Sequence, residues 1–195
     1  MAGQVLVWRF LCRSANFTMT SSSVECYLVP RTDDAPNSRL PILVYRDVLP
    51  QPRIEETATR FLTTHRWEKR GTWGHIAIRH FHPNSHECYG IFQGSSTLLL
   101  GKIQKGKGVE VPVKSGDVVV LPAGTAHSSL ESSSDYRYIG VYPKGCPKWR
   151  NEMGKKSSAV FLDTIDEVDT PEDDPVYGPD GPLPMLWRHT PRSKL

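Results

Sequence analysis

The histidines of this 195-residue chain are unevenly distributed. Four of the seven, His75, His80, His82 and His86, lie within twelve residues of one another. If residues 73–82 form a strand, residues two apart share a face, which places His80 and His82 on the side of two isoleucines. Buried polar rings need partners, and neutral imidazole is the commonest metal ligand in proteins. The pair predicts a metal site, the alternative being two hydrogen-bonded core histidines.

A carboxylate and a further imidazole follow at positions suited to the same ion. A Pro-Asn-Ser turn reverses the chain after His82, and Glu87 then opens the next antiparallel strand. Cross-strand neighbours lie about 5 Å apart, within reach of a shared ligand. His127 follows a Pro-Ala-Gly turn at the start of a later strand. His86 and Glu87 point to opposite faces, so only one of them can ligate, and apolar residues on both faces leave that choice open.

The elements that must hold these side chains are mostly short strands. A helix is predicted over 54–67, where apolar residues recur at helical spacing after Pro52. Elsewhere apolar residues alternate, or form short runs, between turn signals. The predicted strands cover 42–45, 73–82, 87–94, 96–104, 108–113, 117–122, 126–131 and 135–143. Strands at this spacing predict an all-β sandwich or barrel, and the lack of helical patterns between them excludes a parallel α/β sheet.

The chain divides into three predicted parts. Residues 1–30 form an N-terminal extension, residues 31–155 the β domain, and residues 156–195 an acidic and proline-rich tail. We expect a short helix over 146–152. The tail is expected to be extended and to wrap the barrel, anchored by Met185, Leu186 and Trp187.

Composition excludes several partners. The 24 Lys and Arg residues nearly balance 21 Asp and Glu, and no long basic run indicates nucleic acid or an anionic membrane. No apolar stretch approaches the roughly 18 residues of a membrane span. The four cysteines are widely spaced without a CxxC pair, which indicates reduced thiols in an intracellular protein.

Two possible targeting signals lie at the ends of the chain. The last three residues, Ser193, Lys194 and Leu195, form the tripeptide that the peroxisomal import receptor reads. The sequence therefore predicts a peroxisomal location, with the cytoplasm as the alternative. The Arg- and Ser-bearing, acid-free residues 1–18 resemble a mitochondrial presequence, but such compositions arise often by chance.

Two motifs resemble those of the cupin superfamily. The spacing of the first fits in full, and that of the second fits except that Glu131 stands where the family has asparagine. The matching positions are Gly74, His80, His82, Glu87 and Gly94 in the first motif, and Gly116, Pro122, Gly124 and His127 in the second. Outside the motifs, LPILVYRDVL, HECYGIFQGSSTLLLG and DPVYGPDGPLPMLW look like the YjlB-type single-domain cupins.

The resemblance implies a fold and a metal site. It implies an RmlC-like jelly-roll β-barrel with a short N-terminal helix and an extended C-terminal tail. One divalent metal would be held by His80, His82, Glu87 and His127, with Glu87 in place of His86. Single-domain cupins usually pair through a sheet edge, so a homodimer is expected.

The resemblance also bears on function. Similar cupins of fungal polyketide gene clusters are described as oxidoreductases, which implies an enzyme of secondary metabolism. Four protein ligands suit an octahedral Fe(II) with open positions for O₂ and substrate, ahead of Mn, Ni or Zn. The expected lining of Ile76, Ile78, Tyr89 and Ile91 favours a small hydrophobic or phenolic substrate. The alternatives are a non-redox isomerase or decarboxylase and a non-catalytic small-molecule binder; no general acid or base is assigned.

Overall fold

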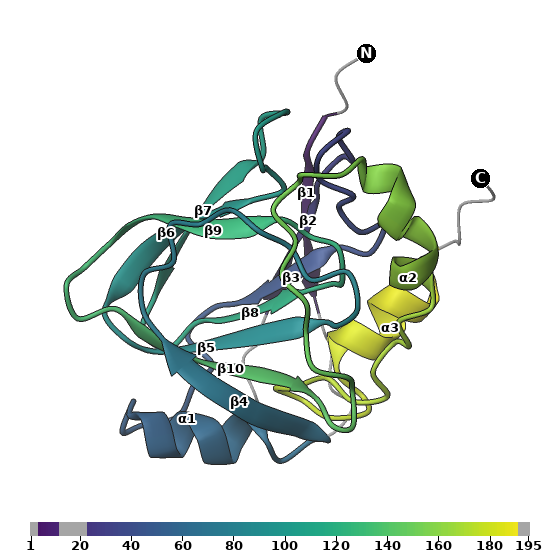
Figure 1. Cartoon of the computed structure of the whole chain (residues 1–195). Helices are drawn as coiled ribbons and strands as arrows, with labels where there is room; N and C mark the ends of the chain where they lie inside the picture. Colours follow the sequence, from purple (N-terminus) through teal and green to yellow (C-terminus); the bar gives the residue numbers. More distant parts are fainter. Residues whose placement is uncertain (1–3, 12–22, 191–195) are drawn as a thin grey trace.

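The computed structural model describes residues 4–11 and 23–190 (Figure 1). The C-terminal tripeptide 193–195, on which the predicted peroxisomal location depends, and most of the acid-free N-terminus lie outside the described residues. The described strands are all antiparallel and form two sheets, with strand orders β1-β2-β3-β8-β5-β10-β4 and β7-β6-β9. Their bounds are β1 Leu6–Leu11, β2 Ser23–Leu28, β3 Ile42–Tyr45, β4 Trp67–Trp73, β5 Glu87–Gln93, β6 Ser95–Leu100, β7 Val109–Lys114, β8 Val118–Leu121, β9 His127–Ser132 and β10 Arg137–Pro143.

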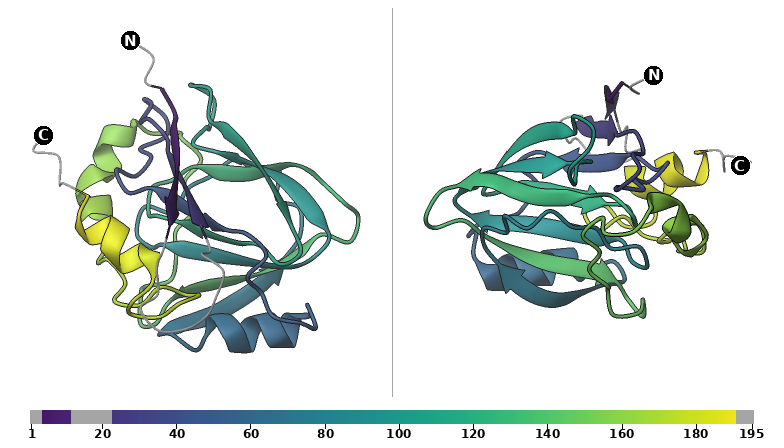
Figure 2. Two further views of the ribbon diagram at one scale, coloured as in Figure 1. Left: turned by 180° about the vertical axis from the view of Figure 1, so that it is seen from behind. Right: turned by 45° about the horizontal axis from the view of Figure 1, so that its top comes forward.

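Four short helices accompany the strands. They are α1 Glu55–Leu62, the 3₁₀ helix η1 Ser158–Phe161, α2 Leu162–Asp166 and α3 Pro182–Arg188. Figure 2 shows α2 and α3 along one side of the barrel, while α1 lies apart from them. Within the described part of the chain, no helix is both long and apolar enough to span a membrane.

The two sheets enclose one apolar core, and helices cover a second. Side chains from the facing strands, such as Val119 and Leu121 of β8, fill the space between the sheets. The alternate residues Val118 and Val120 belong to a cluster with residues of α1 and α3, including Trp187. Because both faces of β8 are covered, its sequence is an unbroken apolar run rather than an alternating one. The prediction of an all-β jelly-roll barrel is confirmed.

Helix α1 is shorter than predicted, and the following strand begins earlier. The helix ends at Leu62 rather than at Trp67, and Trp67 begins β4. The hydroxyls of Thr63 and Thr64 donate to backbone carbonyls one turn back, and Arg66 has a φ of 55°, a left-handed conformation that cannot continue a helix. The strand predicted over 73–82 is therefore wrong beyond Trp73. Residues 74–82 are irregular apart from isolated bridges at His80 and Phe81.

The C-terminal segment is held to the barrel by buried polar contacts. The Asp174 carboxylate accepts hydrogen bonds from the Tyr45 hydroxyl at 2.5 Å and from the Leu183 amide at 3.0 Å. The Trp187 indole is buried and donates to the Pro41 carbonyl at 3.0 Å, whereas Met185 is 40% exposed. Of the predicted anchor, Trp187 and the partly buried Leu186 pack against the core, whereas Met185 does not.

Three expected features differ in the structure: the helix after β10, the extended tail, and the N-terminal extension. Residues 146–152 contain no helix, while η1, α2 and α3 fall within 156–195. Two strands of the larger sheet, β1 and β2, fall within residues 1–30. The three-part division of the chain stays a prediction.

Candidate metal centre

Three imidazoles meet between the two sheets, near one end of the barrel. His127 is the first residue of β9, and its backbone exchanges hydrogen bonds of 2.8 and 3.2 Å with that of His80. His82 lies two residues after His80 in the chain. The ring centroids of His80 and His127 are 4.4 Å apart, and those of His82 lie 5.1 and 5.2 Å from the other two. The backbone bridge therefore fixes the register that brings the three rings together.

Backbone carbonyls orient each of these rings. In all three, Nδ1 lies 2.7–2.9 Å from a carbonyl oxygen, which can only accept a hydrogen bond, so Nδ1 must carry the proton. The pairs are His80 with Ile78, His82 with Arg150, and His127 with Thr125. A hydrogen bond of this kind selects the tautomer of a metal-binding histidine. In the neutral ring, Nε2 then presents a free lone pair.

Two of the three lone pairs, those of His82 and His127, face one carboxylate oxygen. The ligating atoms of the three histidines lie within 4.8 Å of one another. Oε2 of Glu87, the first residue of β5, is 3.1 Å from Nε2 of His82 and 3.4 Å from Nε2 of His127. Both Glu87 Oε2 and His127 Nε2 are buried without a hydrogen-bond partner. Buried acceptors that face one another need a cation between them, and this donor set fits a divalent metal.

The charge state of the cluster also suits a cation. Burial lowers the pKa of His80 to about 4, so this ring is neutral near pH 7. Burial acts to raise the pKa of Glu87, but the facing imidazoles of His127 and His82 outweigh it and hold that pKa well below its usual range, while burial lowers and Glu87 more strongly raises the pKa of His82. Without a metal, a proton between His82 Nε2 and Glu87 Oε2 occupies the place that a cation would take. The second carboxylate oxygen, Oε1, accepts a hydrogen bond of 2.5 Å from the Tyr142 hydroxyl. The site therefore offers one fixed negative charge.

The structure places Glu87, and not His86, in the cluster. His86 lies on the other face of the sheet, where its Nδ1 accepts from the Ala123 amide at 2.9 Å. Its ring packs 4.7 Å from that of Trp187. The sequence left open which of the two residues faces the space between the sheets. Helix α3 covers the face of the sheet that carries His86, and Tyr89 faces the space between the sheets together with Glu87.

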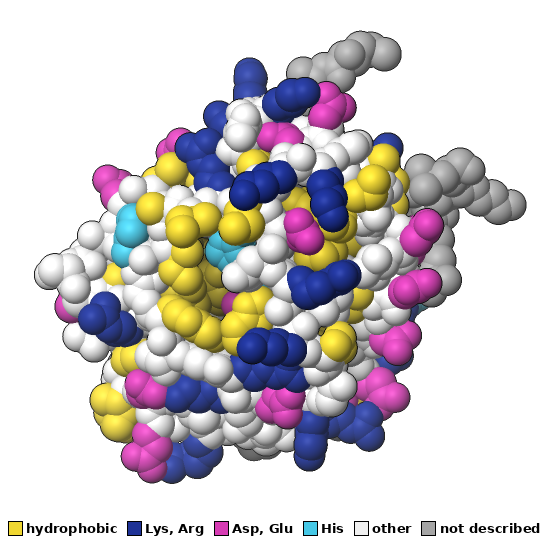
Figure 3. Space-filling view, viewed as in Figure 1, with side chains coloured by type: hydrophobic (Ala, Val, Ile, Leu, Met, Phe, Trp, Pro, Cys, Tyr) yellow, Lys and Arg dark blue, Asp and Glu magenta, His cyan; other side chains and the backbone are white. Residues whose placement is uncertain are grey.

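A pocket of about 240 Å³ opens onto the cluster. Of the residues expected to line it, Ile76, Ile78 and Tyr89 do so, while Ile91 belongs to the core between the sheets. Figure 3 shows hydrophobic side chains around a hollow on this face of the molecule. The remaining lining residues are Trp73, His80, His82, Glu87, Tyr138, Tyr142, Trp149, Asn151 and Met153.

Sequence reasoning missed most of the aromatic lining. Tyr138 and Tyr142 are four residues apart on a strand and so share a face with each other, a signal that was present in the sequence. That this is also the face of Tyr89 depends on the pairing of Gly140 with Tyr89, which the sequence does not show. Trp149 lies in an irregular segment with no periodicity, so no local pattern could have placed it.

Comparisons with known proteins found one curated relative by sequence and several distant solved structures. No protein-family model matches the chain. The Bacillus subtilis (strain 168) protein named uncharacterized protein YjlB is 30% identical over 165 residues, which are 84% of this chain and 96% of YjlB.

Solved structures with similar folds are distant in sequence. A Klebsiella pneumoniae protein with a double-stranded β-helix domain is 17% identical, with 73% of this chain and 90% of that one covered and a TM-score of 0.31. Salicylate 1,2-dioxygenase from Pseudaminobacter salicylatoxidans is 10% identical, with 71% and 26% covered and a TM-score of 0.30. Brassica napus procruciferin is 10% identical, with 59% and 22% covered and a TM-score of 0.34. The chain thus spans about a quarter of the last two proteins.

The described strands form a jelly-roll barrel with an inward-facing histidine cluster, the fold that the two sequence motifs predicted. The identity and coverage shared with the Bacillus subtilis protein show that the chain belongs to the YjlB family.

Proposed function

We propose that this protein is a metal-dependent oxidoreductase that acts on a small hydrophobic or phenolic substrate. One observation carries the proposal: three histidines with Nε2 free to ligate, together with an otherwise unpartnered oxygen of Glu87, converge at an aromatic-lined pocket. His80, His82, Glu87 and His127 would hold one divalent ion.

The donor set favours Fe(II). Three imidazoles and one carboxylate extend the two-histidine, one-carboxylate ligand set of non-haem iron oxygenases by one histidine. Zinc in catalytic sites usually keeps three protein ligands, which makes it a weaker candidate, and Mn and Ni suit the same donors. When bound, a redox-active ion would supply a centre at which O₂ and a coordinated substrate exchange electrons.

The protein's own groups prepare this site. Backbone carbonyls hold the imidazoles in the ligating tautomer, and the Tyr142 hydroxyl holds one oxygen of Glu87 so that the other faces the imidazoles. The tryptophan, tyrosine and isoleucine side chains of the pocket exclude water from a bound substrate. The resemblance to the cupin oxidoreductases of fungal polyketide gene clusters favours a role in secondary metabolism.

Oxygen uptake tests the proposal. Protein loaded with Fe(II) is expected to consume O₂ in the presence of a phenolic substrate, and the His80→Ala variant is expected not to. Conversion of a substrate without O₂ uptake would instead indicate a non-redox enzyme, an isomerase or decarboxylase. Substrate binding without conversion would indicate a binding protein.

A further inference from the structure

The aromatic side chains of the pocket form a continuous wall. The Trp149 and Tyr142 rings are stacked, with centroids 5.0 Å apart and planes 14° from parallel. Trp73 meets the Trp149 ring edge-on at 5.9 Å and lies 6.0 Å from Tyr138, which in turn is 4.1 Å from Tyr89. Such a wall offers flat faces and edges to a planar ring.

The segment that carries Trp149 is fixed in place before any ligand binds. The Asn84 side chain donates to the carbonyl of Lys148 and accepts from the amide of Arg150, each at 2.9 Å, and so holds both neighbours of Trp149. Arg70 donates to the carbonyl of Pro147 at 2.8 Å. A preorganised aromatic platform loses little entropy when a ligand binds.

The pocket lacks a partner for an acidic substituent. Of the described residues that line it, none is lysine or arginine. The formal charge among the lining side chains is the negative charge of the Glu87 carboxylate. A metal ion could accept one anionic oxygen of a ligand, but a carboxylate elsewhere on the ring would be desolvated without a cation beside it. Such unpaired burial of charge is costly.

The pocket is large enough for a single ring. An enclosed cavity of about 150 Å³ in another protein holds benzene. The 240 Å³ pocket therefore has room for one ring beside the cluster, and longer substituents would extend past the exposed rim residues Ile78 and Met153.

Building on the proposed function, we propose that the pocket selects single-ring phenols without an acidic substituent, and that Trp149 is a specificity-determining residue for the ring. Carboxylated phenols of the same size are rejected, because the walls offer them no positive charge.

A matched pair of ligands tests this selection by calorimetry on the full chain loaded with Zn(II), which binds without turnover. The expected affinity for 3,4-dihydroxybenzyl alcohol is at least about tenfold tighter than for 3,4-dihydroxybenzoate, since both offer the metal the same pair of ring oxygens and only the acid buries a carboxylate away from it. Equal affinities, or tighter binding of the acid, would overturn the inference. Because no redox step is involved, such a failure is distinct from a failure to consume O₂ with Fe(II).

A charge-introducing variant provides the converse test. Ile78 lines the pocket and is 66% exposed, so Ile78→Arg places a guanidinium at the rim without burying it. This variant is expected to gain at least about tenfold in affinity for the acid, by pairing its carboxylate. Ile54→Arg, at the start of α1 and 48% exposed, is the matched control and should change neither affinity. An unchanged preference in Ile78→Arg would contradict the charge argument.

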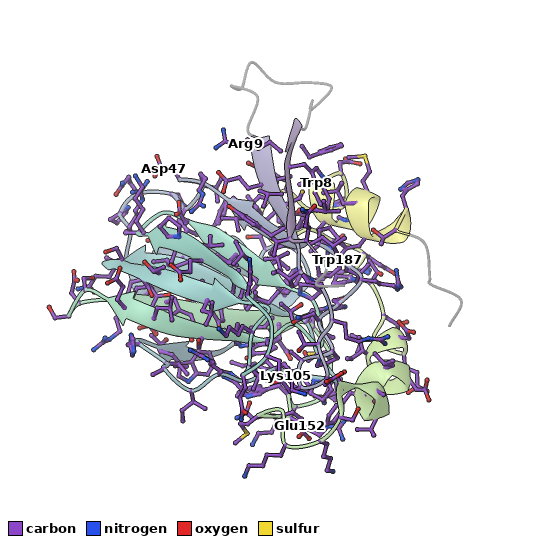
Figure 4. The ribbon with its side chains drawn as sticks, turned by 90° about the horizontal axis from the view of Figure 1, so that it is seen from above. Trp8, Arg9, Asp47, Lys105, Glu152 and Trp187 are labelled. Atoms are coloured by element: carbon purple, nitrogen blue, oxygen red, sulfur yellow. The ribbon has the colours of Figure 1, made fainter. Side chains whose placement is uncertain are left out.

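The role of Trp149 is tested by removing its ring. Trp149→Leu is expected to weaken binding of the alcohol about three- to tenfold, and Trp149→Phe to restore most of the loss, because stacking needs a flat face. Trp8→Leu is the control. Trp8 lies on edge strand β1, and Figure 4 shows it far from Glu152, whose chain neighbours Asn151 and Met153 line the pocket. Equal affinities of wild type and Trp149→Leu would refute the assignment.

Discussion

Replacing Tyr142 with phenylalanine is expected to weaken metal binding about 10- to 100-fold, although the substitution removes one oxygen atom that touches no metal. The Tyr142 hydroxyl donates to Oε1 of Glu87 at 2.5 Å, within a buried environment. A hydrogen bond to a charged group contributes about 1.5–3 kcal/mol, and about 1.4 kcal/mol corresponds to a tenfold change in affinity. Loss of this bond leaves Oε1 free to rotate toward the imidazoles and destabilises the ionised carboxylate.

Competition between the protein and a chelator for Zn(II) measures this effect. Tyr136→Phe is the matched control, because Tyr136 and Tyr142 are each 1% exposed but only the Tyr142 hydroxyl donates to Glu87. The phenylalanine ring in Tyr142→Phe can still stack on Trp149, which separates the hydrogen bond from packing. Equal weakening in both variants, or none in Tyr142→Phe, would refute the reasoning.

Three further predictions follow from the contacts described. Glu87→Gln should weaken metal binding by more than about 100-fold, because loss of a residue that only hydrogen-bonds to a metal ligand already weakens binding about 10–100-fold. His86→Gln should leave metal binding nearly unchanged, and the reverse order in a chelator competition would show that His86 faces the metal. Trp187→Ala should lower the free energy of unfolding by about 3–5 kcal/mol in urea, because the buried indole fills the space over His86 and the sheet; a change under about 1 kcal/mol would show that α3 is not part of the core. A fluorescent protein carrying the last dozen residues should enter peroxisomes through Ser193, Lys194 and Leu195, and diffuse fluorescence that is unchanged when Leu195 is deleted would contradict this location.

The barrel could be predicted because its signals are local. Short apolar runs between turns specify the strands. The spacing of the two motifs indicated the histidines that meet, although the strand alternation expected for His80 and His82 does not exist, and the backbone bridge between His80 and His127 brings the rings together. The choice between Glu87 and His86 depended on which face helix α3 covers, and α3 lies about 100 residues later in the chain. Residues on the two faces of β5 are similarly apolar, so the strand alone could not decide it.

The surroundings of the cluster could not be predicted because they depend on long-range contacts. The carbonyl of Arg150 fixes the tautomer of His82 from 68 positions along the chain, and Asn84 fixes the segment that carries Trp149. Backbone carbonyls occur at every position, so no residue type marks the one that is used. The left-handed Arg66 prevents helix α1 from continuing to Trp67, but arginine gives no sequence signal for that conformation.

Elemental analysis of the purified full-length protein tests most directly whether His80, His82, Glu87 and His127 hold a divalent metal. Wild-type protein is expected to contain close to one divalent ion per chain, and the His80→Ala/His82→Ala double variant, folded by circular dichroism, almost none. Stoichiometric metal in the double variant, or a wild-type protein that takes up no divalent ion when Fe(II), Mn(II), Ni(II) or Zn(II) is supplied, would contradict the assignment.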